Sequence, residues 1–184
     1  GGGAAGQAWV IGVVAGLAEA GFDMTEADLV IGTSSGATAA AWVRSGIPAA
    51  ELYGSILAEP ARPAGQGAPR PAAASAPASL PMETVFERMR AIGAAATSAE
   101  DLRRRMGAFA LETEGTLDPA AAAQRRALVA SRLPRQEWSE KAMIAVAVNA
   151  HTGEPALFDR ASGVDLADAV TASTALPGGH THLI

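Results

Sequence analysis

The chain has 184 residues, of which 49% are hydrophobic, and this composition suits a single domain with a sizeable core. Its formal net charge of −5 argues against broad nucleic-acid binding, and its lack of cysteine excludes thiol nucleophiles, disulfides and iron–sulfur sites. No apolar run has the length of a membrane span, and no basic signal sequence precedes the first predicted helix. We therefore expect a cytoplasmic protein, while secretion stays open.

A glycine cluster, Gly1–Gly2–Gly3, precedes a predicted helix over residues 8–18, which Gly21 ends. This helix is apolar enough to be buried on most of its surface. A glycine-rich loop at a helix start presents backbone amides that suit a phosphate or an oxyanion. An oxyanion hole fits better than a phosphate site, because residues 1–31 contain no lysine or arginine.

The apolar run at residues 29–31 predicts a strand, and a GxSxG pattern over residues 32–36 follows it, before an alanine-rich helix. A strand that turns directly into a helix needs a tight, strained turn, and Gly32 and Gly36 would let the neighbouring backbones pass. The pattern selects Ser34 as the nucleophile, above helix amides that favour negative charge. The alternative is an ordinary turn in which serine caps the helix.

The middle of the chain predicts a helical insert, 82–133, after a mobile, Pro/Ala-rich loop at 59–81. Helices are expected at 47–58, 82–92, 102–109 and 120–133, the last capped by Asp118. The apolar faces of this insert suit either ordinary core packing, which we favour, or a lid over a lipid site. Arg103–Arg105 would then meet a phospholipid head group, although a basic run on a helix is usually a solvated face.

Towards the end of the chain, residues 143–148 and 157–159 predict strands, and a helix follows from Asp168. The near-continuous apolar runs at 29–31 and 143–148 are typical of parallel strands covered on both faces. The fold class is therefore α/β.

Four segments together resemble the patatin-like phospholipase family. They are the glycine loop with its helix and strand, the following Gly32–Ala37, and the two runs 145–154 and 168–178, which are similar to that family's passage from a central strand to a small-residue helix. Ala5 departs from the pattern, because family members commonly carry lysine or arginine there. The resemblance implies one patatin-like domain over 1–184, incomplete at both ends, with a three-layer sandwich: a central, mostly parallel sheet flanked by helices.

The resemblance also implies a serine–aspartate dyad, in which an aspartate of a DG[GA] motif takes the serine proton directly. No Asp-Gly pair occurs in this chain, so the base is assigned to none of its residues. A triad in the order Ser34, an aspartate and a histidine is the alternative. The candidates are Asp159, Asp165 and Asp168 with His180 and His182, while His151 is expected in a turn. His180 and His182 lack a third metal ligand at suitable spacing, so no metal site is expected.

The expected function is lipid acyl hydrolysis, of the phospholipase A or esterase type. Ser34 would attack the ester carbonyl, Gly1, Gly2 and Gly3 would form the oxyanion hole, and water would release the acyl group without any cofactor. The expected substrate is a phospholipid or another fatty-acyl ester, with peripheral membrane contact possible and the oligomeric state open. The alternatives are a non-catalytic patatin-like binding protein without the base, and a serine acyltransferase.

Overall fold

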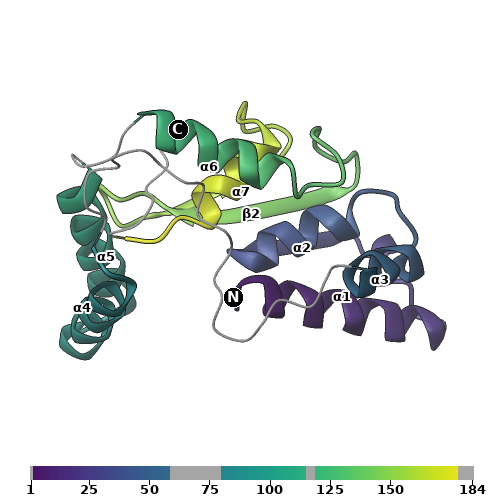
Figure 1. Cartoon of the computed structure of the whole chain (residues 1–184), viewed down its shortest axis with the longest axis horizontal. Coiled ribbons are helices and arrows are strands. Elements are labelled where there is room, and N and C mark those ends of the chain that lie inside the picture. Colours follow the sequence, from purple (N-terminus) through teal and green to yellow (C-terminus); the bar gives the residue numbers. More distant parts are fainter. Residues whose placement is uncertain (1, 59–79, 115–118, 178–184) are drawn as a thin grey trace.

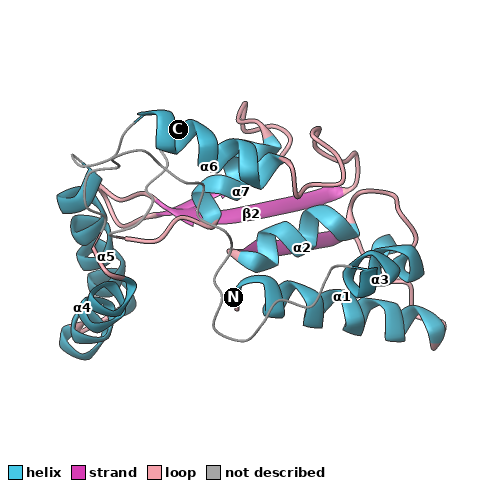
Figure 2. Ribbon diagram, viewed as in Figure 1, coloured by secondary structure: helices cyan, strands magenta, loops and turns pink. Residues whose placement is uncertain are grey.

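The computed structural model describes residues 2–58, 80–114 and 119–177. Helices and strands alternate at both ends of the chain, and helices alone occupy the middle (Figures 1 and 2). The helices are α1 (Gly3–Glu19), α2 (Ser35–Val43), α3 (Ala49–Ala58), α4 (Met82–Ala95), α5 (Ala99–Glu114), α6 (Pro119–Ala130) and α7 (Leu166–Ser173), with a short 3-10 turn, η1, at Met24–Glu26. The strands are β1 (Leu29–Thr33), β2 (Ala142–Val148) and β3 (Pro155–Phe158). The α/β class is confirmed.

The strands form one mixed sheet in the order β1-β2-β3. β1 and β2 are parallel, with Leu29 opposite Ala142 and Thr33 opposite Val146. β2 and β3 are antiparallel and are joined by a short turn. The carboxyl ends of β1 and β2 therefore meet at the same edge of the sheet, and Ser34 follows β1 at that edge.

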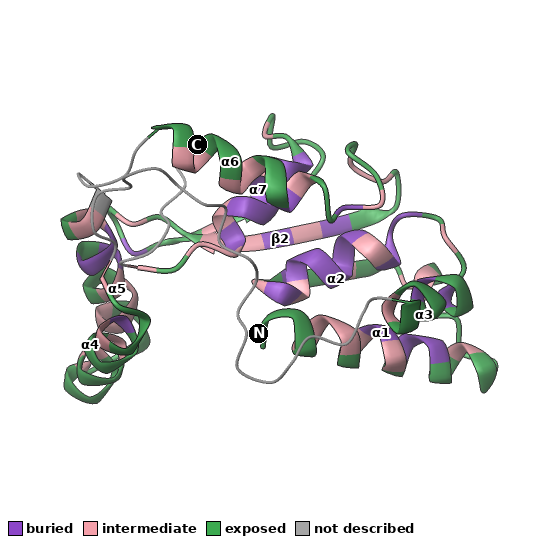
Figure 3. Cartoon of the chain, in the orientation of Figure 1, coloured by how far each residue is buried: buried purple, intermediate pink, exposed green. Residues whose placement is uncertain are grey.

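The main core lies between one face of this sheet and the helices α2, α6 and α7. α2 and α7 cross the sheet side by side (Figure 1), and their sheet-facing surfaces are buried (Figure 3). Alanines dominate this layer and keep the helices close to the strands; the buried cluster comprises Ala37, Ala40, Ala41, Val129, Leu133, Met143, Ala145, Leu166, Ala167, Ala169 and Val170. A second cluster joins α1, α2 and α3, and Val30 packs against both clusters.

Two burial predictions are wrong. The runs 29–31 and 143–148 are not covered on both faces, because Ile31 is 61% exposed and Val148 is 46% exposed. The reason is the two-residue period of a strand, which turns Val30 towards the helices and Ile31 to the opposite face. In α1, Ile11, Val14 and Ala15 are buried, whereas Trp9 is 71% exposed, so this helix buries one stripe and not most of its surface.

The helical insert begins as predicted, with α4 and α5 packed together at the end of the sheet (Figure 1). α5 and α6 confirm the next two expected helices, with bounds shifted by a few residues. Pro48 directly precedes α3, and its carbonyl accepts hydrogen bonds from the Glu51 and Leu52 amides. Asp118 and residues 59–79 of the expected mobile loop lie outside the described residues. None of the described helices combines the length and apolar character needed to cross a bilayer.

Candidate nucleophile site at Ser34

Ser34 joins β1 directly to α2 in a strained backbone conformation. Its φ of 56° and ψ of −130° make it the one non-glycine residue with positive φ in the described part of the chain. Such conformations cost about 1–3 kcal/mol and persist where the surrounding structure enforces them, often at functional sites. Its carbonyl accepts hydrogen bonds from the amides of Ala37 and Thr38, at 2.8 Å and 3.4 Å, but its side chain makes no capping bond. Ser34 therefore occupies the N-cap position of α2, as the alternative expects, but it caps the helix through its carbonyl and not through its side chain.

The two glycines of the GxSxG pattern contribute differently. A Cβ on Gly32 would lie 2.2 Å from the Gly36 carbonyl oxygen and 2.6 Å from the Ala37 Cα, so only glycine allows α2 to start this close to β1. A Cβ on Gly36 would meet nothing within 4 Å. The prediction that a glycine is needed for close backbone approach is thus confirmed for Gly32 and is wrong for Gly36. The backbone of Gly36 is instead one of the groups that approach Gly32.

Ser173, the last residue of α7, holds the turn in place. Its hydroxyl accepts a hydrogen bond from the Ser34 amide at 2.9 Å and donates one to the Val146 carbonyl at 2.6 Å. It thereby links the turn, β2 and α7, and it is 9% exposed. The sequence analysis noted the small-residue segment but missed this role, because only the tertiary contact distinguishes Ser173 from its neighbours.

Two of the three glycines at the start of the chain form the beginning of α1, with Gly2 as its N-cap and Gly3 as its first residue. Gly2 has a φ of 114° and Gly3 a φ of 59°, both in the region that favours glycine. α1 packs against α2, and the two helices start at the same end of the molecule (Figure 1). The first-turn amides of both helices thus point to that end, although the Ala37 amide is already bonded to the Ser34 carbonyl. Gly1 lies outside the described residues.

A largely apolar pocket of about 520 Å³ adjoins the turn. Two neighbours of Ser34 contribute to the wall: Thr33, which precedes it in the chain, and Ser173, whose hydroxyl binds its amide. Other parts of the wall come from β2 and its following turn, from β3, from α4 and α5, and from residues 175–177 after α7. Three apolar residues of the insert considered for a lid, Met89, Leu102 and Met106, therefore line this pocket, whereas Phe109 is 1% exposed within the packing of the insert.

The aspartates considered for a triad have structural partners. Arg126 pairs with Asp168 at 2.7 Å and with Asp165 at 3.4 Å, and the hydrogen bond to Asp168 raises the pKa of Arg126. Both aspartates also lie at the start of α7, where their charge favours the helix dipole. Asp159 accepts a hydrogen bond from the Ala161 amide in the turn after β3. None of these carboxylates is hydrogen-bonded to Ser34 in the described structure.

The histidines divide between the pocket and the undescribed end of the chain. His151 lies in the β2–β3 turn, as predicted, and contributes to the pocket wall. His180 and His182 lie outside the described residues. Across ranges 2–58, 80–114 and 119–177, no three or more His, Asp or Glu residues gather as metal ligands would.

The arrangement offers a strained serine at a helix start, with an apolar pocket beside it. Such a serine can attack an ester carbonyl once a base accepts its proton, and the helix amides can stabilise the resulting oxyanion. Comparison of the chain with models of protein families, with curated proteins and with solved structures gave no match.

Proposed function

We propose that this chain carries the nucleophile of a patatin-like lipid acyl hydrolase. One observation carries the proposal: the strained Ser34 turn adjoins an apolar pocket, with Thr33 and Ser173 common to the two. The side chain of Ser34 is half-buried and makes no capping hydrogen bond, so capping does not account for the backbone strain. The pocket has the size and apolar character of a small-molecule site.

In the proposed reaction, the Ser34 hydroxyl attacks the carbonyl carbon of a fatty-acyl ester and an alcohol leaves. The first-turn amides of α2 and the Gly2–Gly3 loop stabilise the oxyanion, and water then hydrolyses the acyl-enzyme. The acyl chain lies in the pocket. The proton acceptor is the aspartate that the family resemblance implies, which has no counterpart in the described residues. No cofactor or metal takes part.

The proposal extends to a three-layer sandwich in the patatin manner. The sheet face opposite α2 and α7 is apolar, with Leu29 44% exposed and Ile31 61% exposed. A helical layer over this face would remove these side chains from water, at roughly 25 cal/mol per Å² of apolar surface.

The experiment is ester hydrolysis by the full gene product and two serine variants. Ser34→Ala should reduce hydrolysis of a fatty-acyl ester by at least about a thousandfold, as loss of a nucleophile does, with folding intact. Ser35→Ala is the matched control, because Ser35 adjoins Ser34 but is 7% exposed inside α2. Equal activity of Ser34→Ala and the parent protein would refute the proposal.

A non-catalytic binding protein is the second candidate, and one observation favours it: no described side chain is placed to take the Ser34 proton. This candidate predicts lipid binding without turnover in the same assay. Acyl transfer to an acceptor other than water shares the acyl-enzyme and differs in the product released.

A further inference from the structure

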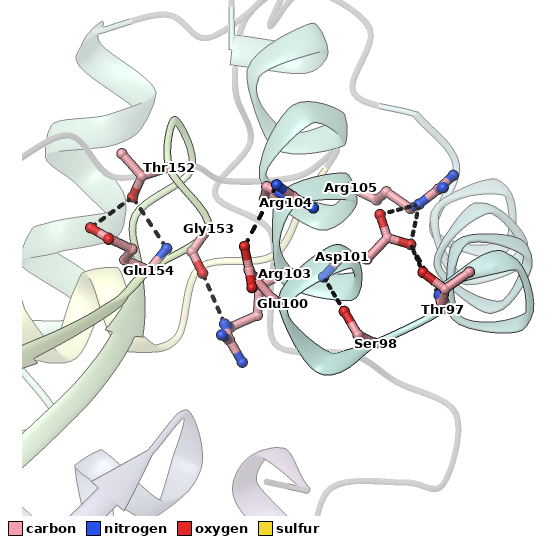
Figure 4. A network of polar contacts seen from close by, with 10 residues as sticks. All are labelled: Thr97, Ser98, Glu100, Asp101, Arg103, Arg104, Arg105, Thr152, Gly153 and Glu154. Carbon is pink, nitrogen blue, oxygen red and sulfur yellow. Dashed lines mark hydrogen bonds and ion pairs between the residues drawn. The ribbon is translucent and has the colours of Figure 1, made fainter.

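The three consecutive arginines of α5 differ in their charge partners. Arg104 pairs with Glu100 at 3.6 Å and Arg105 pairs with Asp101 at 2.9 Å, each one helical turn back. One turn before Arg103 lies Ala99, so the same spacing supplies no carboxylate. In the described residues, Arg103 has no acidic partner within 4.0 Å; the nearby carboxylates Glu100 and Glu154 are bound to Arg104 and Thr152 (Figure 4).

Arg103 is held at the pocket by the β2–β3 turn. Its Nε donates a hydrogen bond to the Gly153 carbonyl at 2.8 Å, and its side chain is part-buried. Figure 4 shows Arg103 directed under this turn, on the opposite side of α5 from Arg105. α5 lies so close to the turn that a Cβ on Gly107 would be 2.2 Å from the Ala150 oxygen, and only glycine fits at this position. The guanidinium is thus positioned by two elements, with its terminal nitrogens left for another acceptor.

The pocket joins this cation to an apolar interior. Arg103, Asn149 and His151 contribute its polar wall beside the turn. The Asn149 Oδ1 already accepts the amides of His151 and Thr152, so its side-chain NH₂ is the free donor. Met106, Ala110 and Leu111 of α5 line the apolar part, which continues to Thr33 and Ser173 at the Ser34 turn.

We propose that this pocket binds a single-chain anionic amphiphile, with its head group on Arg103 and its tail between α5 and β2. A planar guanidinium binds a carboxylate or a phosphate monoester through two parallel hydrogen bonds, and both head groups share that chemistry. Binding does not depend on a reaction at Ser34, so this inference stands apart from the proposed hydrolysis. The ligand occupies the space of the acyl chain and therefore competes with an ester substrate.

The test is displacement of a fluorescent fatty acid from the full gene product carrying Ser34→Ala, which removes turnover. Dodecanoate, dodecyl phosphate and dodecanol are the competitors. Arg103→Gln should weaken both anions by about tenfold or more, the cost of a lost charge-assisted pair, and leave dodecanol within about twofold. Arg105→Gln is the matched control and should leave all three unchanged. A preference for one of the two anions identifies the head group.

Two further variants separate charge from packing. Arg103→Lys keeps the cation and should retain part of the affinity for both anions, whereas Ala110→Leu fills the apolar part and should weaken all three competitors. Equal losses for dodecanol and the anions in Arg103→Gln would overturn the proposal, as would equal effects of Arg103→Gln and Arg105→Gln, or no displacement by any amphiphile. If the parent protein hydrolyses esters but binds no amphiphile, this inference alone is rejected. If it binds amphiphiles but does not hydrolyse esters, the proposed hydrolase activity alone is rejected.

Discussion

Gly32 and Gly36 flank Ser34 symmetrically in the sequence but not in space. Gly32→Ala should lower the free energy of unfolding by about 1–3 kcal/mol, because the added Cβ overlaps the backbone of α2. Gly36→Ala should be neutral or stabilising by up to about 1 kcal/mol, because the site is open and alanine favours a helix. Chemical denaturation of the two variants measures the difference. Equal effects would show that the strand and helix do not meet as closely as described.

Ser173 is the residue on which the position of the Ser34 amide depends. Ser173→Ala removes its hydrogen bonds to the Ser34 amide and the Val146 carbonyl, and should destabilise the protein by about 1–3 kcal/mol. The reactivity of Ser34 should fall with it. The matched control is Ser55→Ala, which loses one exposed bond to the Glu51 carbonyl. A loss no larger than that of the control, measured by chemical denaturation, would contradict this role.

At the scale of elements, a polar cap starts α5, the helix that lines the pocket. Asp101 accepts a hydrogen bond from the Thr97 amide and its own amide donates to Ser98. The Thr97 amide and Arg105 lower the pKa of Asp101. A carboxylate with a lowered pKa stabilises the fold above its ordinary pKa, about 3.9. That stabilisation is lost as the pH falls through the lowered value.

Asp101→Asn should therefore reduce the loss of helix between pH 5 and pH 2, as measured by far-UV circular dichroism. The pH dependence of this loss should fall by the contribution of about one titrating carboxylate. Glu112→Gln is the control on the same helix. An acid transition that Asp101→Asn leaves unchanged would contradict the cap.

Arg44 joins two other segments, the η1 turn and the start of β2, to the end of α2. It is 4% exposed and donates to the carbonyls of Thr25, Ala27 and Ala142 at 2.8, 2.5 and 3.1 Å. Arg44→Met should destabilise the protein by about 2 kcal/mol, because three part-buried carbonyls lose a charged donor. Thermal or chemical unfolding measures this, and a change within about 0.5 kcal/mol would contradict it.

At the scale of the whole molecule, local sequence signals predicted where helices and strands begin and end, but apolar runs did not predict which of their residues are buried. Gly21 and the GxSxG pattern mark real boundaries, because they act on the local backbone. The exposure of Ile31 and Trp9 was missed, because apolar runs do not say which face meets another layer. The role of Ser173 was beyond sequence reasoning, because it depends on segments far along the chain. The sequence suggested a head-group contact for the run Arg103–Arg105, but it could not single out Arg103, whose bond to the Gly153 carbonyl is a tertiary contact.

The central claim is that Ser34 is a strained nucleophile beside a lipid pocket. Its most direct test is covalent labelling of the full gene product with an alkyl fluorophosphonate, followed by peptide mapping. The account predicts one label, on Ser34, that is abolished in Ser34→Ala and reduced when dodecanoate fills the pocket. Labelling of Ser35, or no labelling of the folded protein, would contradict it.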